Sequence, residues 1–182
     1  MGLSVFLSHS HLDHQLAQAL CTFLSFGAGI EMRKIRCTSH AATGLASGDQ
    51  VAKQLRKDIA HTEFFLPLIT ANSAGSEFMA FEIGAAWALK KRIVTLVYMP
   101  AKGGVKLPSL LAEFHYRDIS KQDQLVALAQ DIATEMWVRR DQPNAVEMLT
   151  ATTSFLSQVT LGASPSLPSK GSSKAKSRNQ KR

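Results

Sequence analysis

The stretch LSVFLSHSHLDHQLAQALCTFL (residues 3–24) changes its hydrophobic periodicity within a few residues. Leu3 to Ser8 is a short apolar run, typical of a buried strand. Ser10 and Asp13 then form an S-x-x-D signal for the start of a helix, and the glycines within 27–29 mark its end. The apolar face of that helix recurs at helical spacing, through Leu12, Leu16, Ala19, Leu20 and Phe23. This segment therefore predicts a strand followed directly by an amphipathic helix.

The same alternation continues along the chain. Further strands are expected at Glu31–Cys37, with Met32 and Ile35 inward, and at Phe64–Ile69, Ile93–Tyr98 and Phe114–Tyr116. Helical spacing predicts one helix face formed by Val51, Leu55 and Ile59, a second by Phe78, Phe81, Ala85, Ala88 and Leu89, a third by Leu125, Leu128, Ile132 and Met136, and a further helix over 145–161. Pro67 conflicts with a central strand, because proline cannot donate to a strand ladder.

Strands that alternate with helices predict βαβ units. We therefore expect a three-layer α/β fold, in which a five-stranded, doubly wound parallel sheet has helices on both faces. Ligands of such sheets bind beyond the carboxyl ends of the strands. We therefore expect one cleft to be lined by Ser8 to Ser10, the polar 38–48 loop and the 70–78 segment.

The net charge of +7 comes almost entirely from the last residues of the chain. Six basic residues and no acidic ones follow Ser164, which leaves 15 basic against 14 acidic groups in the rest of the chain. The basic segment 164–182 is expected to be disordered, and nucleic-acid binding is not expected outside it. The sequence has no apolar run long enough to span a membrane and no secretory signal, so we expect a cytoplasmic protein without a membrane partner.

Two cysteines, Cys21 and Cys37, are too few for a disulfide framework or a zinc cluster of their own. They are expected to be buried thiols in a reducing compartment.

The motif HSHLDH (residues 9–14) offers one metal-binding interpretation. It matches H-x-H-x-D-H, in which His9, His11, Asp13 and His14 could hold metal ions that activate water, as in metallo-β-lactamase-fold hydrolases. Only eight residues precede the motif, and the downstream histidines lack the pattern of further ligands. The favoured prediction is therefore a site without metal, and the metallohydrolase remains a remote alternative.

A second group of residues surrounds Glu82. Glu82 follows Phe78 by four positions, so both project from one side of the expected helix and the carboxylate borders its apolar stripe. By spacing alone, a surface glutamate paired with a nearby lysine is the favoured interpretation of the pattern. Ser73 or Ser76 is expected to cap the helix, and Trp87 is expected to lie in the core.

Three segments resemble the bacterial kind of TIR (Toll/interleukin-1 receptor) domain. FLSHSHLD at 6–13 resembles the family's first strand and turn, CTSHAATGLASGDQ at 37–50 resembles its BB loop, and SEFMAFEIGAAWAL at 76–89 resembles its S-x-W-C-x-x-E helix. Phe78 and Met79 replace the tryptophan and cysteine of that last motif, while Ser76 and Glu82 match it. The resemblance implies a flavodoxin-like TIR domain over 1–140. The helical spacing that follows it predicts a C-terminal helical extension over 141–163.

The resemblance also implies an activity. Many TIR domains cleave NAD⁺ between nicotinamide and ribose, and the glutamate that matches Glu82 is their catalytic residue. Products are ADP-ribose or a cyclic ADP-ribose isomer. The expected substrate-binding residues are Ser8, His9, Ser10, Gly44, Leu45, Ser76 and Phe78. The sequence has no G-x-G-x-x-G, so no bound cofactor is expected and NAD⁺ would be the substrate.

The resemblance extends to partners. TIR enzymes self-associate, so the 38–48 loop is expected to contact a second copy. Stand-alone bacterial TIR proteins resemble those of anti-phage defence systems of the Thoeris type, in which a separate effector or sensor protein takes part. The alternative is a TIR scaffold without catalysis, which recruits partners through the BB loop and an adjacent helix face.

Overall fold

A computed structural model describes residues 4–40, 48–73, 76–99, 116–136 and 143–162. Its strands are β1 (Val5–Ser10), β2 (Ile35–His40), β3 (Phe64–Ile69), β4 (Arg92–Ile93), β5 (Thr95–Val97) and β6 (Tyr116–Asp118). Its α-helices are α1 (His14–Gly27), α2 (Gly48–Ala60), α3 (Glu77–Ala88), α4 (Gln122–Met136) and α5 (Ala145–Gly162). Two short 3₁₀ turns, η1 (His11–Asp13) and η2 (Met32–Lys34), precede α1 and β2.

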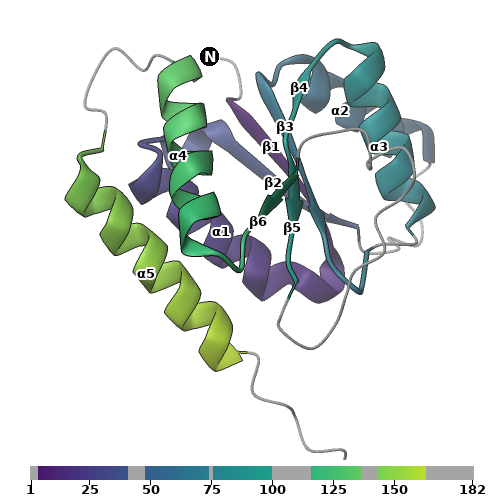
Figure 1. Cartoon of the computed structure of the whole chain (residues 1–182). Coiled ribbons are helices and arrows are strands. Elements are labelled where there is room, and N and C mark those ends of the chain that lie inside the picture. The colour runs from purple at the N-terminus through teal and green to yellow at the C-terminus, as the bar shows by residue number, and fades with distance from the viewer. Residues whose placement is uncertain (1–3, 41–47, 74–75, 100–115, 137–142, 163–182) are drawn as a thin grey trace, which may run out of the picture.

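The strands form one parallel sheet in the order β2-β1-β3-β5-β6 (Figure 1). The short strand β4 also pairs with β3 and lies just before β5 in the sequence. This is the flavodoxin-like arrangement, in which the chain runs outward from β1 in one direction and then turns back to the other side. The expected doubly wound α/β fold is confirmed, and the strand order reverses between β1 and β3.

Pro67 explains why the fourth position of the sheet holds two short strands. β3 pairs with β4 through Phe64 and Phe65, and with β5 through Leu68 and Ile69. Between them, the amide of Val94 donates to the carbonyl of Phe65 at 3.1 Å. The next ladder bond would need an N–H at position 67, which proline lacks. The conflict in the sequence therefore appears as a local break in pairing inside an otherwise central strand.

Two hydrophobic clusters lie on opposite faces of the sheet. One joins Val5 and Leu7 of β1 to α1, α4 and α5, and the other joins Phe6 of β1 to α2 and α3. Figure 1 shows these helices on the two sides of the strands. Because successive strand residues point to opposite faces, β1 contributes to both clusters in turn. The three-layer arrangement follows from this alternation.

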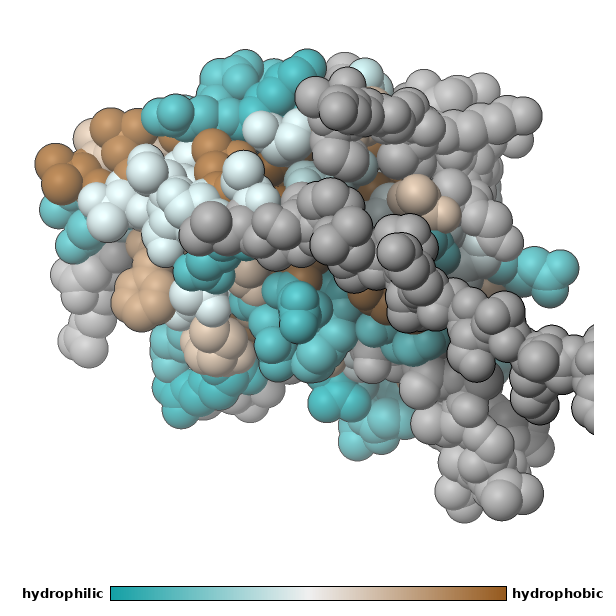
Figure 2. All heavy atoms as spheres, turned by 90° about the horizontal axis from the view of Figure 1, so that it is seen from below, coloured by the Kyte–Doolittle hydropathy of each residue, from teal (hydrophilic) through white to brown (hydrophobic). Residues whose placement is uncertain are grey.

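Helix α5 packs along the outer side of α1 and α4 (Figure 1). The ring of Phe155 lies 5.9 Å from the ring of Phe23, and Phe155 is 2% exposed. Gly27 ends α1 as predicted, and a Cβ added there would lie 3.2 Å from Cβ of Ala151. Between the two helices lies a largely apolar groove of about 510 Å³, and Figure 2 shows hydrophobic side chains gathered on the side where α5 lies.

The boundaries of the first two strands differ from the predictions. β1 runs from Val5 to Ser10 and β2 begins at Ile35, since their parallel pairing extends from Val5↔Ile35 to Ser10↔His40. The segment before Ile35 forms the η2 turn, where Met32 is 49% exposed rather than inward. Backbone pairing with a neighbour therefore decides which residues join the strand, and hydropathy alone misjudged both ends.

The buried face of α3 also differs from the predicted one. Met79, Glu82, Ile83 and Ala86 are buried, whereas Phe78, Phe81, Trp87 and Leu89 are exposed. The expectation that Trp87 lies in the core is wrong, because its side chain is 67% exposed. The helix is apolar nearly all round, so its periodicity carried little information about which face meets the sheet.

Candidate functional site around Glu82

The carboxylate of Glu82 lies under the carboxyl end of β1. The Ser8 hydroxyl donates a 2.5 Å hydrogen bond to Oε2 of Glu82, and both residues are 0% exposed. Ser8 belongs to the β1 face that packs on α2 and α3, as Phe6 does. The surface-glutamate interpretation is therefore wrong: this side chain is buried and held against the sheet.

Local sequence explains how α3 aims Glu82. The Ser76 side chain accepts a hydrogen bond from the Met79 amide and so caps the helix, as predicted. Met79 and Ile83 lie on the same buried face as Glu82 and pack into the hydrophobic cluster. Burying a carboxylate costs several kcal/mol unless hydrogen bonds compensate it. A carboxylate held in this position is therefore a candidate for chemistry at the strand ends.

A second network ties the ends of β1 and β3 together. Oδ2 of Asp13 accepts a 2.7 Å bond from the Thr70 hydroxyl, and Oδ1 accepts a 2.7 Å bond from the Asn72 amide nitrogen. Ser73 accepts a bond from the Thr70 amide at 2.9 Å and donates to the carbonyl of Leu68 at 3.0 Å. Sequence analysis missed this network, although the S-x-x-D and T-x-N-S patterns at the two strand ends contain its polar groups.

Asp13 does not act as the side-chain cap predicted for the first helix. Its carboxylate makes no capping bond, while Ser10 caps the short η1 turn by accepting from the Leu12 amide at 3.4 Å. Asp13 instead crosses to the segment that follows β3. The S-x-x-D signal located the helix start correctly, but the aspartate bonds to the segment after β3 and not to the end of the helix.

His9 faces away from Glu82. His9 directly follows Ser8 on β1 and is 1% exposed. Its Nδ1 atom lies 3.6 Å from Sγ of Cys37 on β2. This is the face of the sheet that packs on α1. The expectation that His9 lines the same cleft as Ser8 is not met, because adjacent strand residues point to opposite sides.

The metal interpretation of residues 9–14 finds no matching geometry. His9 is directed at Cys37, and both carboxylate oxygens of Asp13 are engaged by Thr70 and Asn72. His11 and His14 are exposed. Within the described ranges, no three His, Cys, Asp or Glu side chains are grouped as metal ligands would be.

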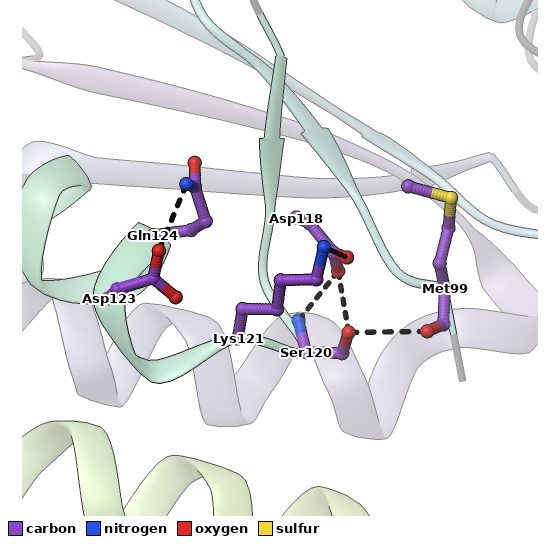
Figure 3. Close-up of polar contacts among 6 residues, drawn as sticks. All are labelled: Met99, Asp118, Ser120, Lys121, Asp123 and Gln124. Carbon is purple, nitrogen blue, oxygen red and sulfur yellow. Dashed lines mark hydrogen bonds and ion pairs between the residues drawn. The ribbon is translucent and has the colours of Figure 1, made fainter. Parts of the chain in front are cut away.

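A further carboxylate at this edge of the sheet has a structural role. Asp118, which ends β6, is 5% exposed and accepts bonds from the amide of Ser120 at 3.0 Å and its hydroxyl at 2.6 Å (Figure 3). It also pairs with Lys121 at 3.3 Å, while the Ser120 hydroxyl lies 3.2 Å from the Met99 carbonyl oxygen (Figure 3). These contacts hold the start of α4 against the end of β5.

The remaining predicted site residues are dispersed. Phe78 is 38% exposed on the first turn of α3, and its ring lies 6.4 Å from that of Phe81. Gly44 and Leu45 lie outside the described residues. The structure therefore brings Ser8 and Glu82 together. Ser10 and Ser76 cap the elements that follow them, and His9 points to the opposite face of the sheet.

Fold and site together define a class of protein: a flavodoxin-like domain with a buried glutamate on its third helix. The sequence pattern of the TIR domain family matches residues 5–132. The chain belongs to the TIR domain family. That family includes NAD⁺ glycohydrolases and signalling adaptors, and TIR domains generally associate with one another.

One similar solved structure agrees with this fold, and two others are similar with lower TM-scores. The TIR domain of the Toll-related receptor TRR-2 from Hydra magnipapillata is 16% identical with a TM-score of 0.52, over 70% of this chain and 96% of that one. Clostridium botulinum CMP N-glycosidase BcmB is 16% identical with a TM-score of 0.44, over 70% and 98%. A flavodoxin-like domain from Synechococcus is 15% identical with a TM-score of 0.39, over 87% and 97%.

Among curated proteins, none matches this chain significantly by sequence. Of the helices that the structure describes, none is both long and apolar enough to cross a membrane.

Proposed function

We propose that this protein is an NAD⁺ glycohydrolase or ADP-ribosyl cyclase, with NAD⁺ as substrate and no further cofactor. Glu82 is the proposed catalytic residue, and Ser8 holds its carboxylate. Ser10, Ser76 and Phe78, together with Gly44 and Leu45 of the 38–48 loop, are proposed to contribute to the substrate site. His9 is left out, since its side chain faces Cys37.

One observation carries the proposal. A fully buried carboxylate at the carboxyl end of β1 is hydrogen-bonded to a strand residue next to the point where the strand order reverses. In doubly wound sheets that point is where ligands bind. Maintaining a carboxylate there costs stability, which favours a role beyond packing.

The chemistry needs only one such group. The nicotinamide ring of NAD⁺ is a cation, so it departs as a neutral ring and requires no general acid. The ribose gains oxocarbenium-like positive charge as the bond breaks, and a fixed carboxylate in a dry site stabilises that charge. Water then gives ADP-ribose, whereas a nitrogen or hydroxyl of the same molecule gives a cyclic isomer.

The test is nicotinamide release by the purified full chain at high protein concentration, with chromatography of the products. Glu82→Gln keeps the size of the side chain and one acceptor oxygen but removes its charge. We expect release to fall by about 10²-fold or more, in the range seen when one transition-state stabiliser is removed. The matched control is Glu77→Gln, an exposed position in the first turn of the same helix. Equal release by wild type and Glu82→Gln contradicts the proposal.

We further propose that the product is a signal in anti-phage defence of the Thoeris type, read by a separate effector or sensor protein. The chain would act as a homo-oligomer, with the 38–48 loop of one copy against the next. The test is protection from phage of cells that naturally encode this chain, by wild type but not by Glu82→Gln. If the inactive variant also protects the cells, the enzymatic product is not the defence signal and this proposal is contradicted.

One observation favours a second function, that of a non-enzymatic TIR scaffold. Helix α3 exposes Phe81 by 48% and Trp87 by 67%, an apolar surface suited to protein contacts. As a scaffold, the protein would lose association on Phe81→Ser and Trp87→Ser but retain it fully in Glu82→Gln. Sedimentation velocity of these variants, beside the nicotinamide assay, separates the two functions.

A further inference from the structure

A buried hydroxyl group on β2 lies beside the bond between Ser8 and Glu82. It belongs to Thr38, whose Oγ1 atom is buried and has no hydrogen-bond partner among the residues that the structure describes. A buried hydroxyl that stays unbonded destabilises a folded protein, so its presence in a native structure needs an explanation. A ligand that supplies the missing bond would provide one.

Strand pairing places Thr38 next to Ser8. The two residues are partners in the register of β1 and β2, and neighbouring strands lie about 4.8 Å apart. Each is followed by only two further residues of its strand, so both lie near the carboxyl ends, where ligands of such sheets bind. β2 is the edge strand (Figure 1), and Thr38 is half-buried, whereas Ser8 and Glu82 are 0% exposed. Of these three residues, Thr38 is therefore the one nearest to solvent.

Thr38 also shares a face of the sheet with the proposed catalytic carboxylate. Two residues earlier on β2, the Nε atom of Arg36 lies 3.0 Å from Oδ2 of Asp58 on α2, so position 36 faces α2 and α3. Cys37 packs instead on the α1 side and is half-buried, so the prediction of two buried thiols holds only for Cys21, which is 7% exposed. Because side chains alternate along a strand, Thr38 faces α2 and α3 again, as the candidate site does.

We propose that Thr38 is a substrate-binding residue, whose hydroxyl forms a hydrogen bond with a hydroxyl of the nicotinamide ribose and so holds the sugar against Glu82. The inference rests on the proposed function and names a further residue of the same site. A ribose hydroxyl can both donate and accept, as the threonine hydroxyl can, so the two groups suit each other in either direction. The bond gives the Thr38 Oγ1 atom the partner that the described residues do not provide.

A sugar hydroxyl suits this position better than a phosphate group of NAD⁺ does. The Glu82 carboxylate is held next to Thr38 by Ser8 and would repel a phosphate, whereas it does not repel a neutral hydroxyl. A bond at Thr38 also fixes the orientation of the ribose, whose anomeric carbon gains positive charge near the carboxylate. Thr38 thus positions the sugar, and the stabilisation of charge remains with Glu82.

The test replaces Thr38 by valine, which keeps the shape and the β-branching of the side chain but removes the hydroxyl. Nicotinamide release by the purified full chain is measured with NAD⁺ and with analogues that lack the 2′- or the 3′-hydroxyl of the nicotinamide ribose. With NAD⁺, kcat/KM of Thr38→Val is expected to fall about tenfold, the effect of one lost hydrogen bond. With the analogue that lacks the bonded hydroxyl, the same substitution should cost less than about twofold, because that bond is already absent.

Stability separates substrate binding from a role in the fold. Thr38→Val should melt at the same temperature as wild type or higher, since it removes a buried hydroxyl without a partner. The matched control is Thr62→Val. Thr62 is 2% exposed, its Oγ1 atom likewise has no partner among the described residues, and it precedes β3 at the opposite, amino edge of the parallel sheet. This control should leave kcat/KM unchanged for all three substrates.

Thr38→Ser, which keeps the hydroxyl, should retain most of the wild-type kcat/KM and decides the inference if the valine variant does not fold. An unchanged kcat/KM in Thr38→Val, beside an active wild type, would overturn the inference and leave the proposed function intact. So would an equal loss with NAD⁺ and with both analogues, or a lower melting temperature of Thr38→Val than of Thr62→Val. If wild type releases no nicotinamide, the proposed function itself fails, and this inference fails with it.

Discussion

Two neighbouring residues of β1, Ser8 and His9, make polar contacts on opposite faces of the sheet. Ser8 bonds to Glu82 on the α3 side, and His9 contacts Cys37 on the α1 side. This separation is a direct result of strand pleating, which turns successive side chains to opposite faces. Each residue therefore has its own test, and a substitution on one face should leave the other largely unchanged.

Ser8→Ala is expected to lower catalysis without weakening substrate binding. A hydrogen bond to a charged group contributes about 1.5–3 kcal/mol, so a less well oriented Glu82 should release nicotinamide about tenfold more slowly or worse. The KM for NAD⁺ should change less than about twofold, because Ser8 acts through Glu82. The control is Thr22→Ala, an exposed hydroxyl on α1 that bonds only to its own helix at the Gln18 carbonyl. An unchanged rate in Ser8→Ala would contradict the positioning role.

Cys37 should react with iodoacetamide at a rate that hardly depends on pH. With its pKa lowered to about 5, Cys37 is already mostly thiolate at pH 6, so its alkylation rate should change less than about twofold between pH 6 and pH 8. A cysteine of ordinary pKa gains about tenfold for each pH unit over that range. The groups that face Cys37 are Cys21 and His14 of α1 and His9 of β1. A tenfold increase per unit, followed by peptide mapping at Cys37, would contradict the assigned contacts.

At the scale of elements, two glycines provide a matched pair for helix packing. A Cβ at Gly84 of α3 would meet nothing within 4 Å, whereas one at Gly27 of α1 would lie 3.1 Å from the Phe23 ring and 3.2 Å from Cβ of Ala151. Replacing glycine by alanine inside a helix gains about 0.5–1 kcal/mol. Gly84→Ala should therefore raise the free energy of unfolding by that amount.

For Gly27→Ala, the change in the free energy of unfolding should be at least about 1 kcal/mol less favourable than for Gly84→Ala. The added methyl would force α1 and α5 apart or push the Phe23 ring aside. Urea denaturation of both variants measures the difference. Equal stabilisation of the two would show that α5 does not pack against α1 as described.

The elements also mark the limit of what sequence could predict. The strand–helix alternation, the sheet class and the Ser76 cap followed from periodicity and capping signals, because these depend on local chemistry. The buried face of α3 did not, since Phe78, Phe81 and Trp87 make its exposed side as apolar as its buried one. Glu82 was singled out by its motif, but only the packing of α3 on β1 shows that it is buried.

Long-range contacts were likewise beyond the reach of sequence. The bonds from Thr70 and Asn72 to Asp13 join residues 57 and 59 positions apart, and no spacing rule connects them. The same holds for the contact between His9 of β1 and Cys37 of β2, which are 28 positions apart. β2 begins four residues later than hydropathy predicted, at Ile35 instead of Glu31. Its start is decided by pairing with β1, which outweighs the weak alternation of residues 31–37.

At the scale of the whole molecule, β1 and β3 lie side by side in the sheet. The connection after β1 leads to one side of the sheet and the connection after β3 leads to the other side. TIR domains generally associate with one another, and we propose that the 38–48 loop of one copy completes the site of the next. Nicotinamide release per molecule should therefore rise with protein concentration until assembly is complete. Chromatographic assays across a hundredfold dilution, beside sedimentation velocity, measure this. A specific rate that stays constant while the oligomeric state changes would contradict a shared site.

The most direct test of a catalytic carboxylate at position 82 is chemical rescue. Glu82→Ala removes the group and leaves a space beside Ser8 that a small carboxylate can fill. The account predicts that this variant, which circular dichroism should show to be folded, loses nicotinamide release and regains part of it when formate is added, but not with chloride at the same ionic strength. Wild-type release by Glu82→Ala in the absence of formate would contradict it.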